Sequence, residues 1–140
     1  MALDKKKQIF TFVLMDPPFE SARTTTAMRL IHAAVCNGLD VKVFAYEGAV
    51  FLPLASQKAH ANSIHGRGPE EENHPLTKDW VSSLAEEAVR RGGSMEWVNC
   101  GLCVDERGAQ DVVPAVRRGS PLDLLQFSEI SDQVLVIPTR

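Results

Sequence analysis

The first third of the sequence switches between two periodicities, and this switching constrains the fold more than any other feature. Residues 8–15 (QIFTFVLM) form a short, nearly continuous apolar run of β-prone residues, typical of a strand covered on both faces. Residues 25–38 then place apolar side chains at helical spacing, and Gly38 is suited to end the helix. Residues 39–51 alternate and predict a second strand with a turn near Gly48. Strand, helix and strand in succession predict a βαβ unit with parallel pairing and a right-handed crossover.

The remaining sequence repeats this pattern after a long irregular segment. Residues 56–78 are polar, contain glycines, prolines and three of the four histidines, and predict a long loop. A helix is then expected at 79–93, a strand at 94–100, a last helix at 121–132 and a last strand at 133–139. The side chains expected to face the core are Trp80, Val81, Leu84 and Ala88 in the first of these helices and Leu122, Leu125 and Ile130 in the second.

Length and charge restrict the class of protein. A chain of 140 residues fits one domain with a single core. The net charge of −3 argues against nucleic-acid binding, which needs clustered Lys and Arg. No apolar run reaches the roughly 18 residues of a membrane span, so no membrane association is expected. Three cysteines with only one close pair do not fit a secreted disulfide framework, and a cytoplasmic location is expected.

Two of the cysteines stand three positions apart in the stretch CGLCVDERG, directly after the third expected strand. Ligand sites of open α/β sheets lie beyond the carboxyl ends of strands, and Cys100 occupies such an end. If the following residues open a short helix, Cys100, Cys103 and Arg107 share one face. The helix dipole and the guanidinium group would then favour a thiolate. Asp105 and Glu106 would oppose this effect unless they point away.

Three other interpretations of the cysteine pair remain open at this point. A structural zinc site needs four ligands, and the other candidates are Cys36 and scattered loop histidines, so no metal is expected. A redox dithiol is compatible with the spacing, although a thioredoxin fold places its CxxC early in the chain. The two cysteines can also be inert, partly buried residues. No glycine occurs in residues 16–24, after the first strand, so no phosphate-binding loop and no cofactor are expected.

Three stretches carry a family resemblance. Residues 16–50 combine a loop, a helix and a strand of the form G-x-x-V-x-V-F that ends in a glycine turn. CGLCVDERG has the form C-x-x-C-x-x-x-R-G, and residues 124–138 supply a closing helix and strand. In this order and spacing they resemble the DsrE/DsrF-like sulfur-relay family, which includes TusD-type and YchN-like proteins, over nearly the whole chain.

The resemblance implies a single-domain three-layer α/β/α sandwich with a mainly parallel five-stranded sheet, assembled as a homo-oligomer, either a trimer or a hexamer. It implies a sulfur carrier or sulfurtransferase that takes sulfane sulfur from a donor protein as a persulfide on Cys100 and passes it to an acceptor protein. Cys103 would be the additional thiol, able to resolve or protect the persulfide. Arg107, Gly101 and Gly108 would complete the site. The loop at 56–78 is longer and richer in histidine than the resemblance leads us to expect.

The remaining chemistry-bearing side chains have simpler expected roles. Cys36, at the end of the first helix, is interpreted as a core residue, and His32 as a structural histidine. His60, His65 and His74 are interpreted as solvated loop residues, and the alternative is that one of them covers the cysteines as a lid.

Asp16, Glu20 and Arg23 follow the first strand and could border the same crevice as the cysteines, although turn and helix-start roles explain the two acids equally well. The alternative function is a non-catalytic scaffold or ligand-binding protein. The two functions differ in the reactivity expected of Cys100, which is exposed and acidic in a carrier and buried and slow in a scaffold.

Overall fold

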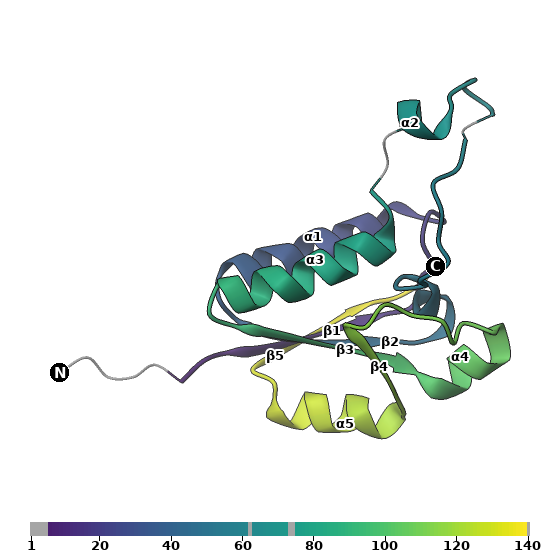
Figure 1. Cartoon of the computed structure of the whole chain (residues 1–140). Coiled ribbons are helices and arrows are strands. Elements are labelled where there is room, and N and C mark those ends of the chain that lie inside the picture. Colours follow the sequence, from purple (N-terminus) through teal and green to yellow (C-terminus); the bar gives the residue numbers. More distant parts are fainter. Residues whose placement is uncertain (1–5, 62, 73–74, 140) are drawn as a thin grey trace.

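A parallel sheet of five strands forms the centre of the molecule (Figure 1). The computed structural model describes residues 6–61, 63–72 and 75–139. All four strand pairings are parallel, in the order β4-β3-β2-β1-β5. The strands are β1 (Ile9–Leu14), β2 (Asp40–Ala45), β3 (Ser94–Cys100), β4 (Val116–Gly119) and β5 (Gln133–Ile137).

Helices lie on both faces of this sheet, which confirms the predicted three-layer α/β/α sandwich (Figure 1). Helices α1 (Ala22–Cys36) and α3 (Thr77–Arg90) cover one face, and α5 (Pro121–Ile130) covers the other. Helix α4 (Gly101–Arg107) lies at the end of the sheet where the strands finish. The short 3-10 helix η1 (Glu47–Phe51) and the helix α2 (Pro69–Glu72) complete the described elements.

The hydrophobic core is unequal on the two faces. The larger part lies under α1 and α3, where Trp97 is fully buried together with Met28, Ile31 and Val35 of the apolar stripe of α1. On α3 the expected residues Val81, Leu84 and Ala88 are buried, whereas Trp80 is only partly buried. The face under α5 holds a small cluster that includes Cys100. The first cysteine of the pair therefore belongs to the thinner side of the core.

The strand and turn predicted within residues 39–51 are confirmed: β2 ends at Ala45, and the chain turns at Glu47, which has a backbone φ of 50°. The residues of the turn form the 3-10 helix η1, which the sequence did not predict. Gly48 packs against the loop after β1, since a Cβ at this position would lie 2.7 Å from Cδ of Pro17. This turn carries η1 to the carboxyl end of the sheet, beside α4.

The orientation predicted for the last helix is wrong. Leu122, Leu125 and Ile130 are each more than half exposed, and the buried residue of α5 is Phe127. The reason lies in the first turn, where Asp123 completes a capping box with Ser120 and also accepts a hydrogen bond from Arg117 of β4. These bonds hold Asp123 toward the sheet, and Phe127, one turn further on, faces the sheet with it.

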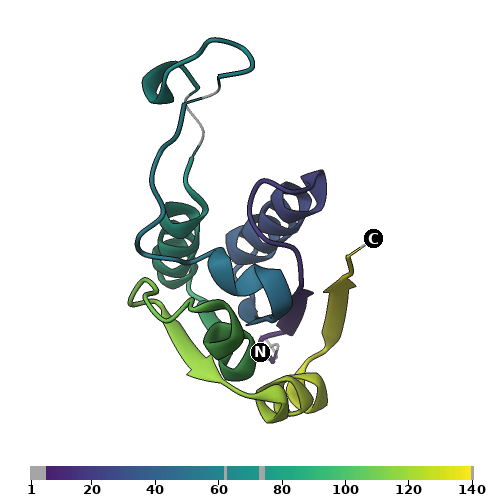
Figure 2. The same cartoon turned by 90° about the vertical axis from the view of Figure 1, so that its right-hand side faces the viewer.

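The described residues between 56 and 76, namely 56–61, 63–72 and 75–76, form a protruding arm where the sequence predicts a long loop. Figures 1 and 2 show the arm projecting away from the sheet and its covering helices, with α2 near its end. At its base, His60 packs edge-on against Phe19, with ring centroids 5.5 Å apart. The arm is thus attached to the body next to the loop that follows β1.

Candidate functional site

The cysteine pair lies where strand β3 passes into helix α4. Cys100 is the last residue of β3 and the N-cap position of α4, and Cys103 lies in the first turn of that helix. The short helix expected after Cys100 is therefore present. It has only seven residues, so few peptide dipoles add up along it, and the dipole favours a thiolate less than a long helix would.

Cys100 is buried in the isolated protomer, with an exposed fraction of 5%. It packs in an apolar cluster with Phe44, Val98 and Phe127 from β2, β3 and α5. Cys103 is half-buried, its thiol interacts with that of Cys100, and neither cysteine is in a disulfide. The two sulfur atoms are thus adjacent, and the more accessible one is on Cys103.

Opposing effects act on the Cys103 thiol. Burial raises its pKa, and the neighbouring Cys100 raises it further. The backbone N–H of Glu47 donates to the sulfur and the charge of Arg107 attracts the thiolate, and both effects lower the pKa. The net result is a raised pKa. Arg107 thus acts in the expected direction, but burial outweighs it.

Helix η1 brings two residues to the cysteines that the sequence did not identify. Tyr46 packs against the cluster that contains Cys100, and burial, Glu47 and Cys103 all raise the pKa of its phenol. Glu47 supplies the backbone N–H described above. No sequence motif connects these two residues with the cysteines, and only the turn after β2 and its packing beside α4 bring them there.

Arg118 of strand β4 is a further member of the site. Its guanidinium group donates to both carboxylate oxygens of Asp105 on α4, at 2.7 Å each. The same group lies against Gly101, where a Cβ would be 2.7 Å from its Nε. Gly101 therefore provides the space that the arginine occupies. Asp105, which was expected to disfavour a thiolate, has its charge paired here, and the bond with Arg118 lowers its pKa.

Arg107 and Gly108 end helix α4. Gly108 adopts the left-handed conformation with φ of 66°, which a glycine accepts without strain, so its position follows from helix termination. Arg107 pairs with Glu106 at 3.2 Å. It also lines a cavity of about 720 Å³ that is bordered by Asp16 and Glu20.

The residues after β1 are therefore divided between two places. Asp16 and Glu20 border the Arg107 cavity, which neither cysteine lines, and Asp16 also accepts a hydrogen bond from Ser21, the N-cap of α1. Arg23 instead donates to the backbone oxygen of Pro138, which follows β5, at 2.9 Å. The cavity beside Arg107 is thus bordered by Asp16 and Glu20, and Arg23 lies elsewhere.

Cys36 is not the core residue that the sequence indicated. It is half-buried at the last position of α1, one residue beyond the fully buried Val35. Its sulfur lies 3.3 Å from Nε2 of His32, one turn earlier on the same helix. The thiol and the imidazole satisfy one another, which agrees with a structural role for His32.

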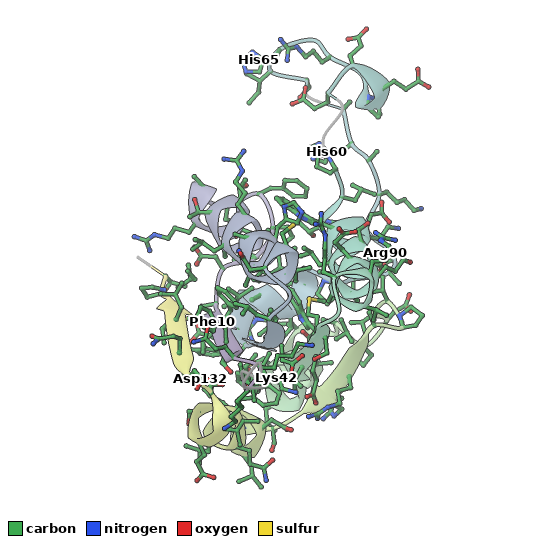
Figure 3. All side chains as sticks on the ribbon, turned by 90° about the vertical axis from the view of Figure 1, so that its left-hand side faces the viewer. Phe10, Lys42, His60, His65, Arg90 and Asp132 are labelled. Carbon is green, nitrogen blue, oxygen red and sulfur yellow. The ribbon has the colours of Figure 1, made fainter. Side chains whose placement is uncertain are left out.

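The loop histidines lie with the arm. Figure 3 shows His60 at the base of the arm and His65 near its far end, and both are exposed. His74 lies outside the described residues. In the part of the chain that is described, no group of three or more His, Cys, Asp or Glu side chains is arranged to hold a metal ion. No helix within these residues has the length and apolar character needed to cross a membrane.

Comparison with known proteins gives the family. A sequence profile of the DsrE/DsrF-like family matches residues 8–137. The chain belongs to the DsrE/DsrF-like family. This family is generally linked to sulfur relay.

Similar proteins extend over nearly the whole length of the chain. An uncharacterized protein of Methanopyrus kandleri is 27% identical over 129 residues, 91% of this chain and 92% of that protein. An uncharacterized protein of Methanocaldococcus jannaschii is 23% identical over 90% of this chain and 96% of its own length. The crystal structure of the ychN protein from E. coli superposes with a TM-score of 0.71 at 19% identity, covering 94% of this chain and 99% of that chain. At 19% identity, the likeness to the ychN protein shows a shared fold.

Proposed function

We propose that this protein is a sulfur carrier or sulfurtransferase that holds sulfane sulfur as a persulfide on Cys100. The observation that carries the proposal is the pair of neighbouring free thiols at the carboxyl end of β3, in a chain of the DsrE/DsrF-like family. Two adjacent thiols supply both a carrier and a second sulfur nucleophile. The partners are a sulfur-donor protein and a sulfur-acceptor protein.

The reaction is an exchange at sulfur. The Cys100 thiolate attacks the outer sulfur of a donor persulfide, forms Cys100–S–SH, and releases the donor as a thiolate. An acceptor thiolate then attacks the outer sulfur and restores the Cys100 thiolate. No net oxidation or reduction occurs in either step.

Cys103 has a different role in this scheme. Its thiolate can attack the inner sulfur of the persulfide, which forms a Cys100–Cys103 disulfide and expels hydrosulfide. The raised pKa of Cys103 keeps most of this thiol protonated at neutral pH and so slows the attack. The persulfide thereby survives long enough to meet an acceptor.

Intact-protein mass spectrometry after brief exposure to inorganic polysulfide tests the proposal. We expect an adduct of about 32 Da, one sulfur atom, on the wild type and on Cys103→Ser, and none on Cys100→Ser. Cys36→Ser is the matched control, because this cysteine lies outside the pair, and it should load normally. Full loading of Cys100→Ser would assign the sulfur to another residue. Loss with Cys103→Ser instead would exchange the roles of the two cysteines.

One observation favours a second candidate, a non-catalytic scaffold or ligand-binding protein. Cys100 is nearly inaccessible in the protomer, and the pKa of Cys103 is raised, as expected for thiols that only fill space. A wild type that forms no adduct and alkylates slowly at both cysteines would support this candidate over sulfur carriage.

A further inference from the structure

A tyrosine from the neighbouring strand lies next to Cys100. Strands β2 and β3 pair in register up to Ala45 and Asn99, so the next residues along the two strands are Tyr46 and Cys100. Tyr46 keeps an extended backbone, and its N–H donates to the backbone oxygen of Leu14 at 3.1 Å, which continues the strand geometry by one residue. Because paired strands lie about 5 Å apart, Tyr46 and Cys100 are direct neighbours.

The side chains of Tyr46 and Cys100 point to the same face of the sheet. Side chains alternate between the two faces along a strand. Phe44 and Val98, two positions earlier on each strand, belong to the apolar cluster on the α5 face, and Tyr46 packs against that cluster. The rings of Phe44 and Tyr46 lie 6.0 Å apart between centroids. The tyrosine ring therefore packs on the α5 face, where the Cys100 thiol lies.

Half-buried side chains separate the cluster around Cys100 from solvent. Cys100 is itself only 5% exposed, and the partly buried residues that pack against its cluster are Tyr46, Cys103 and Leu124. A sulfur donor that approaches from solvent therefore meets these three side chains before it meets the Cys100 sulfur. Since reacting atoms must come within about 3–3.5 Å of each other, one of the three has to move aside.

Two of these side chains are held in place by the helices that carry them. Cys103 lies in the first turn of α4. Leu124 follows Asp123, which completes the capping box of α5 and pairs with Arg117 of β4 at 2.7 Å. Tyr46 instead precedes the first turn of η1, and among the described residues no hydrogen bond holds its phenol hydroxyl. Its ring can therefore turn about the Cα–Cβ bond without breaking a polar contact.

We propose that the ring of Tyr46 covers the Cys100 sulfur and selects, by their size, the sulfur donors and acceptors that reach it. A small reagent passes during brief movements of the ring, whereas a bulky reagent requires a larger displacement. Tyr46 is thus a specificity-determining residue for the transfer. The inference deepens the proposed function and rests on it for the identity of the reagents as sulfur donors and acceptors, while the cover over the thiol is present in the resting protein.

Alkylation tests the inference in a chain whose only thiol is Cys100. Cys36→Ser and Cys103→Ser are combined for this purpose, so that intact-protein mass spectrometry reports on Cys100 alone. Two reagents of the same chemistry, N-methylmaleimide and the much larger fluorescein maleimide, are compared at one pH. The readout is the ratio of the rate constant of the large reagent to that of the small one. A change in the thiolate fraction alters both rates equally and cancels in this ratio.

Tyr46→Ala in this chain should raise the ratio about tenfold, because the large reagent no longer depends on displacement of the ring. Tyr46→Phe should leave the ratio at its starting value, since the ring is retained and only the hydroxyl is lost. Leu102→Ala is the matched control, because it shortens an apolar side chain near the thiol that is 66% exposed and lies outside the cover. A ratio unchanged in Tyr46→Ala, or raised equally by Tyr46→Phe or by Leu102→Ala, overturns the inference.

A second variant covers the case in which Tyr46→Ala does not fold, which circular dichroism would reveal. Tyr46→Leu keeps apolar bulk beside Phe44 and lacks the broad ring, so its ratio should lie above the starting value. A ratio in Tyr46→Leu equal to the starting value overturns the inference in that case.

The outcome can be separated from that of the proposed function, because alkylation requires no sulfur donor. A raised ratio in Tyr46→Ala, together with absence of the persulfide adduct in the wild type, would retain Tyr46 as the cover of Cys100 and reject sulfur carriage. An adduct on Cys100 with an unchanged ratio in Tyr46→Ala would retain sulfur carriage and reject the role of Tyr46.

Discussion

Asn99, immediately before the cysteine pair, shows how one buried side chain holds the site together. It is 1% exposed, accepts a hydrogen bond from Nε1 of Trp97 at 3.1 Å, and donates to the backbone oxygen of Val50 at 3.0 Å. Because Val50 belongs to η1, the amide fastens η1 to strand β3. The contacts that η1 makes with the cysteines depend on this attachment.

We expect Asn99→Ala to lower the free energy of unfolding by about 2–3 kcal/mol, since it leaves a buried indole N–H and a buried carbonyl without partners. Urea denaturation monitored by tryptophan fluorescence measures the change. The matched control is Ser128→Ala, which removes a side-chain hydrogen bond to Leu125 at an exposed position of α5 and should cost less than about 0.5 kcal/mol. Equal losses in the two variants would contradict the role given to Asn99.

At the scale of elements, a chain of charges connects three strands with helix α5. Lys42 of β2 and Arg117 of β4 both donate to Glu96 of β3, at 2.9 and 2.7 Å, and Arg117 also donates to Asp123 of α5. Figure 3 shows Lys42 on the side of the sheet near α5. This network places polar side chains under the start of α5 and explains why Leu122 and Leu125 face outward.

The network makes stability depend on pH. Burial alone would raise the pKa of Glu96, but hydrogen bonds from Lys42 and Arg117 outweigh it and leave the pKa below its ordinary value of 4.5. A carboxyl group whose folded pKa is lowered stabilises the fold above its unfolded pKa, and the stabilisation disappears as the pH falls through the folded value. We expect Glu96→Gln to cost about 1 kcal/mol at pH 7, a value reduced by solvent screening, and less near pH 3, where protonation of Glu96 competes with its ion pairs.

Urea denaturation of the wild type and Glu96→Gln at both pH values measures this difference. The control is Glu129→Gln on the outer side of α5, which should have little effect at either pH. A cost in Glu96→Gln that is the same at pH 3 and pH 7 would contradict the electrostatic origin.

Elements with a strong periodic pattern could be predicted from the sequence, and elements defined by tertiary contacts could not. The apolar run of β1, the stripe of α1 and the strand leading to Cys100 are correct because burial on both faces of a parallel sheet leaves such patterns. Strand β4 was not identified, because its four residues include the exposed Arg117 and Arg118 and show no apolar alternation. The cysteine pair was located by its spacing and its place after a strand, whereas Arg118 reaches Gly101 and Asp105 of α4 only because β4 pairs with β3.

At the scale of the whole molecule, one edge of the sheet carries an uncovered apolar surface. Val134, Leu135 and Val136 of the edge strand β5 are all exposed, as are the outward leucines of α5. Figure 2 shows β5 at the side of the molecule, with its outer edge free of any other element. An apolar cavity of about 630 Å³, lined by Phe10 and Leu30 among others, adjoins this strand. Exposed surface of this kind is common at subunit interfaces.

We propose that further copies of this chain cover the surface in a homo-oligomer, either a trimer or a hexamer. Light scattering coupled to size-exclusion chromatography should then give a multiple of the 15.4 kDa chain mass. Leu135→Asp should reduce the mass to that of the protomer, because a buried carboxylate at the interface is costly. Val89→Asp, on the exposed side of α3, is the control and should leave the assembly intact. A wild type that runs as a protomer contradicts the proposal.

The protruding arm has a consequence for how the polypeptide can be divided. Strands β2 and β3, on either side of the arm in sequence, pair along six positions at the centre of the sheet, and α1 packs against α3. A trypsin cut after the exposed Arg67 would therefore sever the chain and leave the sheet intact. The two fragments should co-elute and separate only in denaturant. The parts of the chain before and after the arm are therefore two complementing fragments, and such fragments are suited to a split reporter.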